Sequence, residues 1–304
     1  VPTFPPAHVP TAGRHGCCSV EDALDARAVA ARLGIPFYVL NFEADFERII
    51  DYFVDEYAHA RTPNPCVLCN IHLKFGKLLR YADMLDAAFV ATGHYARILR
   101  GNVRRWERGN GAADAAAQTS YLAHARNLAK DQSYVLFGIQ RADLARCLFP
   151  LGDVTDKAEV RRYAAQLGLK VHDKPDSQEI CFVPDGDYKP LVRARRPETQ
   201  RPGPVLDAAG QELGTHEGVA NYTIGQRRGL RIATGQPIYV TALDLERNIV
   251  RVGPQAALAC SGLIAERVNW LVDPPASGHW RPAAIKIRHM HTPAAGQIWV
   301  ADAE

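Results

Sequence analysis

Residues 62–94 read TPNPCVLCNIHLKFGKLLRYADMLDAAFVATGH and contain a cysteine loop, a helix and a strand in that order. After the loop, apolar side chains recur at helical spacing, at Ile71, Phe75, Leu78, Ala82 and Leu85. The apolar run 88–92 then predicts a buried strand that ends at Gly93 and His94. Ligands bind at the carboxyl ends of parallel strands, so a candidate site is expected at these two residues.

Helices and strands also alternate before this stretch, and one more helix is expected after it. Ser19 is a suitable N-cap for the first helix, and Gly34 is suited to end it. The expected elements are a helix over 23–33, a strand over 37–40, a helix over 45–59 and a helix from Thr155 to Gly168. This alternation predicts the α/β class, with a parallel sheet that helices cover.

Two later regions lack this alternation. Residues 100–127 are rich in Gly and Ala without periodicity, and we expect a loose surface excursion there. Beyond about residue 195 the chain becomes mostly β, with turns such as Asp207–Gly210. Short strands are expected at 205–213, 237–241, 248–252, 285–287 and 298–300.

Composition excludes two broad classes of protein. The chain has 304 residues, 47% apolar and 23% charged, which is ordinary for a soluble protein of two or three domains. No apolar run approaches the roughly 20 residues of a membrane span, and the N-terminus lacks signal-peptide features. Seven cysteines, an odd number, argue against a secreted disulfide framework and for a reducing, cytoplasmic setting. With a net charge of +3, nucleic-acid binding would need local basic patches.

The cysteines carry the first chemical signal. Cys66-x-x-Cys69 alone is compatible with half a zinc site, a redox dithiol or packed thiols, and no second zinc-ligand pair is obvious. Its Pro-rich loop leads into a helix N-terminus, which favours thiolate over thiol. Cys181 lies in a separate polar segment and indicates a partner for thiol chemistry. The remaining cysteines are expected to be small apolar fillers: Cys17, Cys18, Cys147 and Cys260.

Two further segments combine charge with turn residues. Lys130–Tyr134, KDQSY, places a cation, an anion, an amide and a phenol together, although a solvated helix start would also explain it. Tyr222–Gly229, YTIGQRRG, holds two arginines between glycines, which suits close approach to a phosphate backbone. An ordinary basic turn is the alternative interpretation of this second segment.

Taken in order, these segments resemble the tRNA-specific 2-thiouridylases, which replace the C2 oxygen of the wobble uridine, position 34 of tRNA, with sulfur. Each segment is weakly specific by itself, whereas the whole series in the family's order is very specific. The matching segments are 16–19, 62–70, 74–76, 91–97, 130–134, 149–152, 174–182 and 222–229.

The resemblance implies the fold and the domains. They are a nucleotide-hydrolase-like (PP-loop ATPase) catalytic domain at 1–195, a small, mostly β central domain at 196–255 and a C-terminal β-barrel at 256–304. The family's opening strand and Ser-Gly-Gly-Val-Asp-Ser phosphate loop are not in this sequence, and its barrel continues beyond Glu304. Because that loop binds pyrophosphate, we expect a fragment or a misplaced gene start that does not bind ATP productively.

The resemblance also implies residue roles. Cys69 would be the nucleophile, and Cys181 would carry sulfur as a persulfide and form a transient disulfide with Cys69. Gly93 would contact ATP. The target base would lie near Asn64, Pro65 and Cys66, where some members have Asp in place of Cys66. The tRNA contacts would be His94, Lys130, Asp131, Gln132, Arg288 and His289.

The cofactors and partners follow from the same resemblance. ATP with Mg²⁺ would adenylate the C2 oxygen, and a persulfide-relay protein or cysteine desulfurase would supply sulfur to a monomeric, cytoplasmic enzyme that needs no membrane. Two alternatives remain open at this point. One is a non-catalytic tRNA-binding remnant that lacks the phosphate loop. The other is a 4Fe–4S cluster on Cys66, Cys69 and Cys181 with one open iron position.

Overall fold

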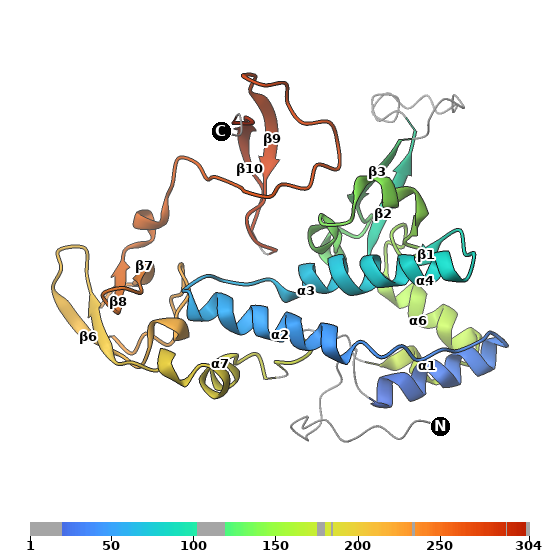
Figure 1. Ribbon diagram of the computed structural model, residues 1–304, viewed down its shortest axis with the longest axis horizontal. Helices are drawn as coiled ribbons and strands as arrows, with labels where there is room; N and C mark the ends of the chain where they lie inside the picture. Colours follow the sequence, from blue (N-terminus) through green and yellow to red (C-terminus); the bar gives the residue numbers. More distant parts are fainter. Residues whose placement is uncertain are drawn as a thin grey trace. The chain divides into compact units, whose positions relative to one another are not determined.

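The computed structural model describes residues 20–101, 119–174, 180–183, 185–232, 235–289 and 291–301 (Figure 1). Cys17, Cys18, the expected cap Ser19 and part of the Cys181 segment lie outside these ranges. The chain divides into two compact units. The first unit comprises Val1–Pro65 and Arg161–Gly262, and the second comprises Cys66–Val160 and Leu263–Glu304.

Two helices open the first unit much as the sequence predicts. Helix α1 covers Val20–Leu33 and is followed by Gly34, whose φ of +67° is the left-handed conformation that often ends a helix. Helix α2 covers Glu43–Ala58. It buries one face at helical spacing, with Ile49, Phe53, Val54 and Tyr57 pointing inward.

The strand expected over 37–40 is not formed. Tyr38 and Val39 are 74% and 62% exposed, and no strand of the described ranges pairs with this run. An apolar run becomes a strand only when neighbouring strands take up its backbone hydrogen bonds, so the local signal was insufficient.

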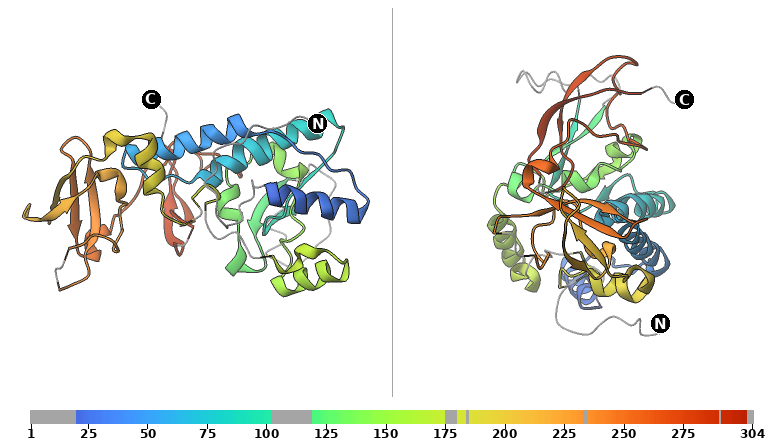
Figure 2. Two further views of the ribbon diagram at one scale, coloured as in Figure 1. Left: turned by 90° about the horizontal axis from the view of Figure 1, so that it is seen from below. Right: turned by 90° about the vertical axis from the view of Figure 1, so that its left-hand side faces the viewer.

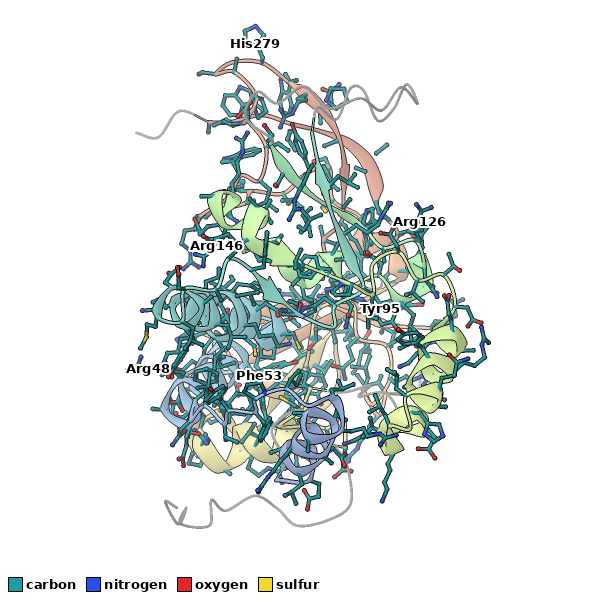
Figure 3. All side chains as sticks on the ribbon, turned by 90° about the vertical axis from the view of Figure 1, so that its right-hand side faces the viewer. Arg48, Phe53, Tyr95, Arg126, Arg146 and His279 are labelled. Atoms are coloured by element: carbon teal, nitrogen blue, oxygen red, sulfur yellow. The ribbon has the colours of Figure 1, made fainter. Side chains whose placement is uncertain are left out.

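Aromatic side chains of α2 and of the segment 182–188 pack together in the core of the first unit. Phe53, labelled in Figure 3, is fully buried, and its ring lies 5.1 Å from that of Phe182. Tyr57 stacks on Tyr188 with 3.7 Å between ring centroids. Helix α7 (Lys189–Arg195) adds the fully buried Val192 to this cluster.

A four-stranded sheet in the order β6-β5-β8-β7 completes the first unit (Figure 2). The pairing β5–β8 is parallel, and β5–β6 and β7–β8 are antiparallel. The strands are β5 Gly203–Leu206, β6 Glu212–His216, β7 Tyr239–Asp244 and β8 Ile249–Gly253. The predicted turn Asp207–Gly210 is confirmed by the bond from Gly210 N–H to Asp207 O at 3.1 Å, and it divides the expected strand 205–213 in two.

The second unit contains the cysteine helix and the predicted parallel strand. The expected α-helix over 71–85 is partly wrong, because residues 69–77 wind as a π-helix. A Cβ on Gly76 would lie 2.7 Å from the Ile71 carbonyl oxygen, so this winding needs glycine there. The elements are α3 Pro65–Leu68, η1 Cys69–Lys77, α4 Leu78–Met84, β1 Val90–Ala91 and β4 Cys147–Leu148, with β1 and β4 parallel.

Two antiparallel hairpins complete the second unit. Strand β2 (Ala96–Arg100) pairs with β3 (Ser120–His124). The expectation of a loose excursion over 100–127 was therefore wrong at Arg100 and at 120–124, where the structure shows strands. Residues 102–118 lie outside the described ranges. Strand β9 (Arg281–Ile285) pairs with β10 (Ala294–Ile298), and both begin earlier than the sequence suggested.

The remaining elements are short. Helix α6 covers Lys157–Gln166, close to the range expected before Gly168. No helix in the described ranges is long and apolar enough to cross a membrane. The 3₁₀ helices are η2 Leu128–Lys130, η3 Ser133–Leu136, η4 Arg141–Arg146, η5 Lys170–Asp173, η6 Pro197–Thr199, η7 Val219–Asn221 and η8 Gln255–Leu258.

Of the cysteines expected to be apolar fillers, the structure describes two, and they differ in burial. Cys147 is fully buried, and burial raises the pKa of its thiol to about 12, which confirms that it is an unreactive packing residue. Cys260 is exposed, so the expectation of a buried filler was wrong there. It follows η8 in a stretch without strand or helix, where packing does not cover it.

We predict that Gly152→Ala destabilises the second unit. A Cβ at this position would lie 1.8 Å from the carbonyl oxygen of Ala96, so strand β2 would have to move. The expected loss is about 1–3 kcal/mol of unfolding free energy, measured by urea denaturation. Gly262→Ala is the control, because its Cβ would have no heavy atom within 4 Å. Equal midpoints for both variants would contradict the prediction.

Candidate functional site

The cysteine segment is a loop that becomes a helix without a break. Pro65 begins α3, where a missing N–H costs nothing, and its side chain is buried. Cys66 lies in the first turn and is exposed, whereas Cys69 begins the π-helix and is half-buried. Asn64 is half-buried just before the helix. The structure therefore places the expected base-pocket residues directly beside the expected nucleophile along one segment.

Cys181 occupies a tight turn in the first unit. The Val183 N–H donates to the Ile180 carbonyl at 2.8 Å, which closes the turn around Cys181 and Phe182. Ile180 and Phe182 both pack against the core beneath α2, while Cys181 itself is only half-buried. Its position is thus fixed by its neighbours, while the residue itself remains partly exposed.

Lys174, at the start of the same motif, has a structural role. Its ammonium donates to Asp22 and Asp25 of α1, both at 2.5 Å. The hydrogen bond to Asp22, followed by that to Asp25, raises the pKa of Lys174. This pair of contacts attaches the Cys181 segment to α1.

The residues after β1 divide into an open glycine and a buried histidine. A Cβ on Gly93 would meet only Leu151 Cδ1, at 3.9 Å, so its backbone is open to ligand approach, as a nucleotide contact requires. His94 is 6% exposed, and its ring lies 6.0 Å from those of Phe75 and Phe149. Burial, then the charge of Lys74, lowers the pKa of His94 to about 4, so its ring is neutral at pH 7.

The turn 130–133 is held by internal hydrogen bonds. Asp131 accepts bonds from the Ala125 N–H at 2.7 Å and the Ser133 hydroxyl at 2.6 Å, and lies 2.9 Å from His124 Nδ1. Burial alone would raise the pKa of Asp131, but these bonds hold it below its usual value. The Asp131 side chain is 7% exposed, so the structure turns this expected tRNA contact inward.

Gln132 links the same turn to the loop after His94. Its Oε1 accepts from the Tyr95 N–H at 2.9 Å, and its backbone N–H donates to the Tyr95 carbonyl at 2.8 Å. Tyr95, labelled in Figure 3, is buried. Lys130 is half-buried at the end of η2.

Tyr134 joins two segments that the sequence separates widely. Its hydroxyl donates to the Ile287 carbonyl at 3.2 Å, and its ring lies 6.0 Å from the His289 ring. The Lys286 ammonium lies 5.5 Å from the Tyr134 ring centroid. Tyr134 directly follows the segment of the expected tRNA contacts 130–132, and it contacts the segment that carries the exposed Arg288 and His289. Sequence reasoning did not assign this role to Tyr134, although the phenol in KDQSY was its signal.

The arginine loop of the first unit is open to solvent. Arg227 and Arg228 are exposed between Gly225 and Gly229, whose φ values are +85° and +76°. Within the described chain, no ion pair is formed by either arginine. A cavity of about 420 Å³ adjoins the loop. Its lining is Arg227, Gly229, Leu230, Arg231, Ile232, Gln236, Pro237 and Ile238.

Metal-ligating side chains do not cluster in the part of the chain that the structure describes. There, no group of three or more His, Cys, Asp or Glu residues is placed to hold a metal ion. Cys66 and Cys69 belong to the second unit, and Cys181 belongs to the first.

Comparison with known proteins gives consistent matches along the chain. A family model described as the tRNA methyl transferase HUP domain matches residues 7–185, and one described as the tRNA methyl transferase PRC-barrel domain matches 194–254. These matches confirm the α/β class followed by a small barrel-like domain.

Curated relatives named tRNA-specific 2-thiouridylase MnmA are similar over most of the chain. The protein from Roseiflexus sp. (strain RS-1) is 51% identical over 271 residues, which cover 88% of this chain and 71% of the relative. That from Geobacter metallireducens is 49% identical, covering 93% and 73%. That from Heliobacterium modesticaldum is 45% identical, covering 96% and 73%.

We predict that His94 makes the fold less stable in mild acid. Its pKa is about 4 when folded and about 6.5 when unfolded, so the unfolded chain binds more protons between these values and stability rises with pH there. Lowering the pH from 7 to 5 should therefore cost about 2 kcal/mol through His94, measured by urea denaturation. His94→Gln should lose this part of the dependence. An unchanged pH slope in that variant would contradict the assignment.

Proposed function

The chain belongs to the tRNA-specific 2-thiouridylase family, and on this premise we propose that it transfers sulfur to C2 of the wobble uridine in tRNA. The observation that best supports this proposal is the contact between Tyr134 and the 286–289 segment. It gathers a lysine, an arginine, a histidine and an aromatic ring at one place in the second unit. Such a set can bind phosphate and stack on unpaired bases, as RNA recognition requires.

The two half-buried thiols take separate roles in this proposal. Cys181 receives sulfur as a persulfide from a relay protein or a cysteine desulfurase. The Cys69 thiolate attacks the inner sulfur of that persulfide, which releases hydrosulfide and forms a Cys69–Cys181 disulfide. A thiol reductant then supplies two electrons and two protons to restore both thiols. Relay of the outer sulfur through Cys69 is the other route to the same product.

The base and the nucleotide need their own binding groups. The target uridine must leave its stack and would lie near Asn64, Pro65 and Cys66, beside Cys69. ATP with Mg²⁺, when bound, would adenylate the C2 oxygen, so that this oxygen could leave as part of AMP when sulfur takes its place. The backbone of Gly93 is open enough to contact the nucleotide. The exposed arginines of 225–229 would bind the RNA phosphate backbone.

Cys181→Ser should abolish 2-thiouridine formation, because serine cannot carry a persulfide. The complete gene would be expressed in cells without their own 2-thiouridylase, and tRNA nucleosides would be measured by mass spectrometry. Cys260→Ser is the matched control, since this cysteine is exposed, lies in the same unit and has no proposed role. It should leave thiolation unchanged.

Three further results, from this experiment and from analysis of the purified protein, distinguish the alternatives. Normal thiolation by Cys181→Ser would overturn the persulfide assignment. Stoichiometric iron and acid-labile sulfide in anaerobically purified protein, lost on Cys181→Ser, would favour a 4Fe–4S cluster on Cys66, Cys69 and Cys181. Tight tRNA binding without any thiolation by the unaltered protein would favour a non-catalytic tRNA-binding role.

The arginine loop should contribute to tRNA affinity through charge alone. In Arg227→Gln/Arg228→Gln, the slope of log affinity against log salt concentration should become shallower by about 0.7–0.9 for each phosphate that the loop no longer neutralises. Filter binding at several salt concentrations would measure this slope. Arg247→Gln, also exposed and in the first unit, is the control and should not change it. Equal slopes for both variants would remove the loop from the interface.

A further inference from the structure

The side chain next to Cys69 is polar but buried. Asn70 is 2% exposed, and its Nδ2 donates to the carbonyl of Val135 at 3.2 Å. Its Oδ1 is also buried and has no hydrogen-bond partner among the described residues. An unpaired buried amide oxygen destabilises the folded state, because it gives up its hydrogen bond to water. An apolar side chain at this position would bury no unpaired oxygen. The hydrogen bond to the Val135 carbonyl is therefore what the amide provides and an apolar side chain could not.

Ile71 contacts the same region as Asn70. A Cβ on Gly138 would lie 2.3 Å from both Cδ1 and Cγ1 of Ile71, so this glycine leaves the space that the isoleucine side chain fills. Val135 lies in η3, and Gly138 follows it closely. Two consecutive residues of the π-helix are therefore fixed against η3 and the residues that follow it.

This contact occurs where the helix winding is unusual. Cys69 is the first residue of the π-helix, and the turn changes there from the α-helical winding of α3. A π-helical turn is wider and less favourable than an α-helical one, and it persists where neighbouring contacts hold it. The direction of the Cys69 side chain thus depends on what holds Asn70 and Ile71.

We propose that Asn70 is a positioning residue for Cys69: its buried amide ties the thiol-bearing turn to Val135, in the segment that also holds Tyr134. Asn70 does not touch the reacting atoms in this scheme. The inference rests on the proposed function, because it assumes that Cys69 is the nucleophile and that the turn before Val135 seats tRNA. Correct placement of the thiol then depends on the same structure that binds the substrate.

Asn70→Leu tests the inference, because it keeps a similar volume and removes the amide. Cys69 alkylation by iodoacetamide would be followed from pH 6 to pH 9 by mass spectrometry of the digested protein. Cys66, three residues earlier, is the internal reference. We expect the pH profile of Cys69 to shift and that of Cys66 to stay unchanged. In thiolation assays, kcat should fall by about tenfold or more, and the KM for tRNA should stay within about twofold.

Gly138→Ala is an independent variant that disturbs the same turn from the other side. The three atoms nearest to the added methyl group all belong to the Ile71 side chain, which can adopt another rotamer, so the variant should fold. Its Cys69 profile should shift as in Asn70→Leu, and Gly262→Ala should behave like the unaltered protein.

The outcomes separate this inference from the proposed function. Unchanged Cys69 profiles and kcat in both variants would overturn it. Equal changes at Cys66 and Cys69 would also overturn it, because they would indicate general loosening of the segment. Failure of the unaltered protein to bind tRNA would defeat the proposed function, whereas the alkylation comparison would still decide whether Asn70 positions Cys69.

Discussion

Hydrogen bonds to the carboxylate of Asp131 hold the turn that joins strand β3 to η3 in the second unit. The carboxylate accepts hydrogen bonds from Ala125 and Ser133 and lies 2.9 Å from His124. These contacts join the end of strand β3 to the start of η3 and so stabilise the turn between them. A buried carboxylate is costly unless it is hydrogen-bonded in this way, and the bonds overcome the effect of burial on its pKa. Asp131 therefore serves RNA binding, as we propose it, by shaping the turn that carries Lys130.

Three links extend from this turn to the rest of the unit. Gln132 pairs with the backbone of Tyr95, Tyr134 contacts the 286–289 segment, and Val135 accepts the hydrogen bond from Asn70. Each link comes from a different residue of one short segment. A displacement of the turn 130–133 would therefore move three regions together: the loop after His94, the β9–β10 hairpin and η1. Such shared dependence is expected when a substrate-binding turn and a nucleophile must be aligned.

Local signals in the sequence predicted local structure well. Helix α2, the glycine after α1 and the turn at 207–210 each depend on residues close together in the chain. The sequence could not show which strands pair, because the β2–β3 hairpin depends on contacts across a segment without periodicity, and residues 37–40 form no strand. The site followed the same rule: the motifs marked the cysteines, whereas the contact from Tyr134 to Ile287 spans 153 positions.

The proposed reactive thiols share an arrangement that Cys147 lacks. Cys147 packs its own side chain into the core, and burial raises its pKa, so it is poorly suited to form the thiolate on which reactivity depends. At Cys69 and Cys181 the adjacent residues make the buried contacts instead, namely Asn70 in one unit and Ile180 with Phe182 in the other. The neighbours hold the backbone in place, while each cysteine residue stays partly exposed. This arrangement reconciles the two demands on a sulfur-transfer cysteine, a fixed direction of attack and access for a partner that must deliver or remove sulfur.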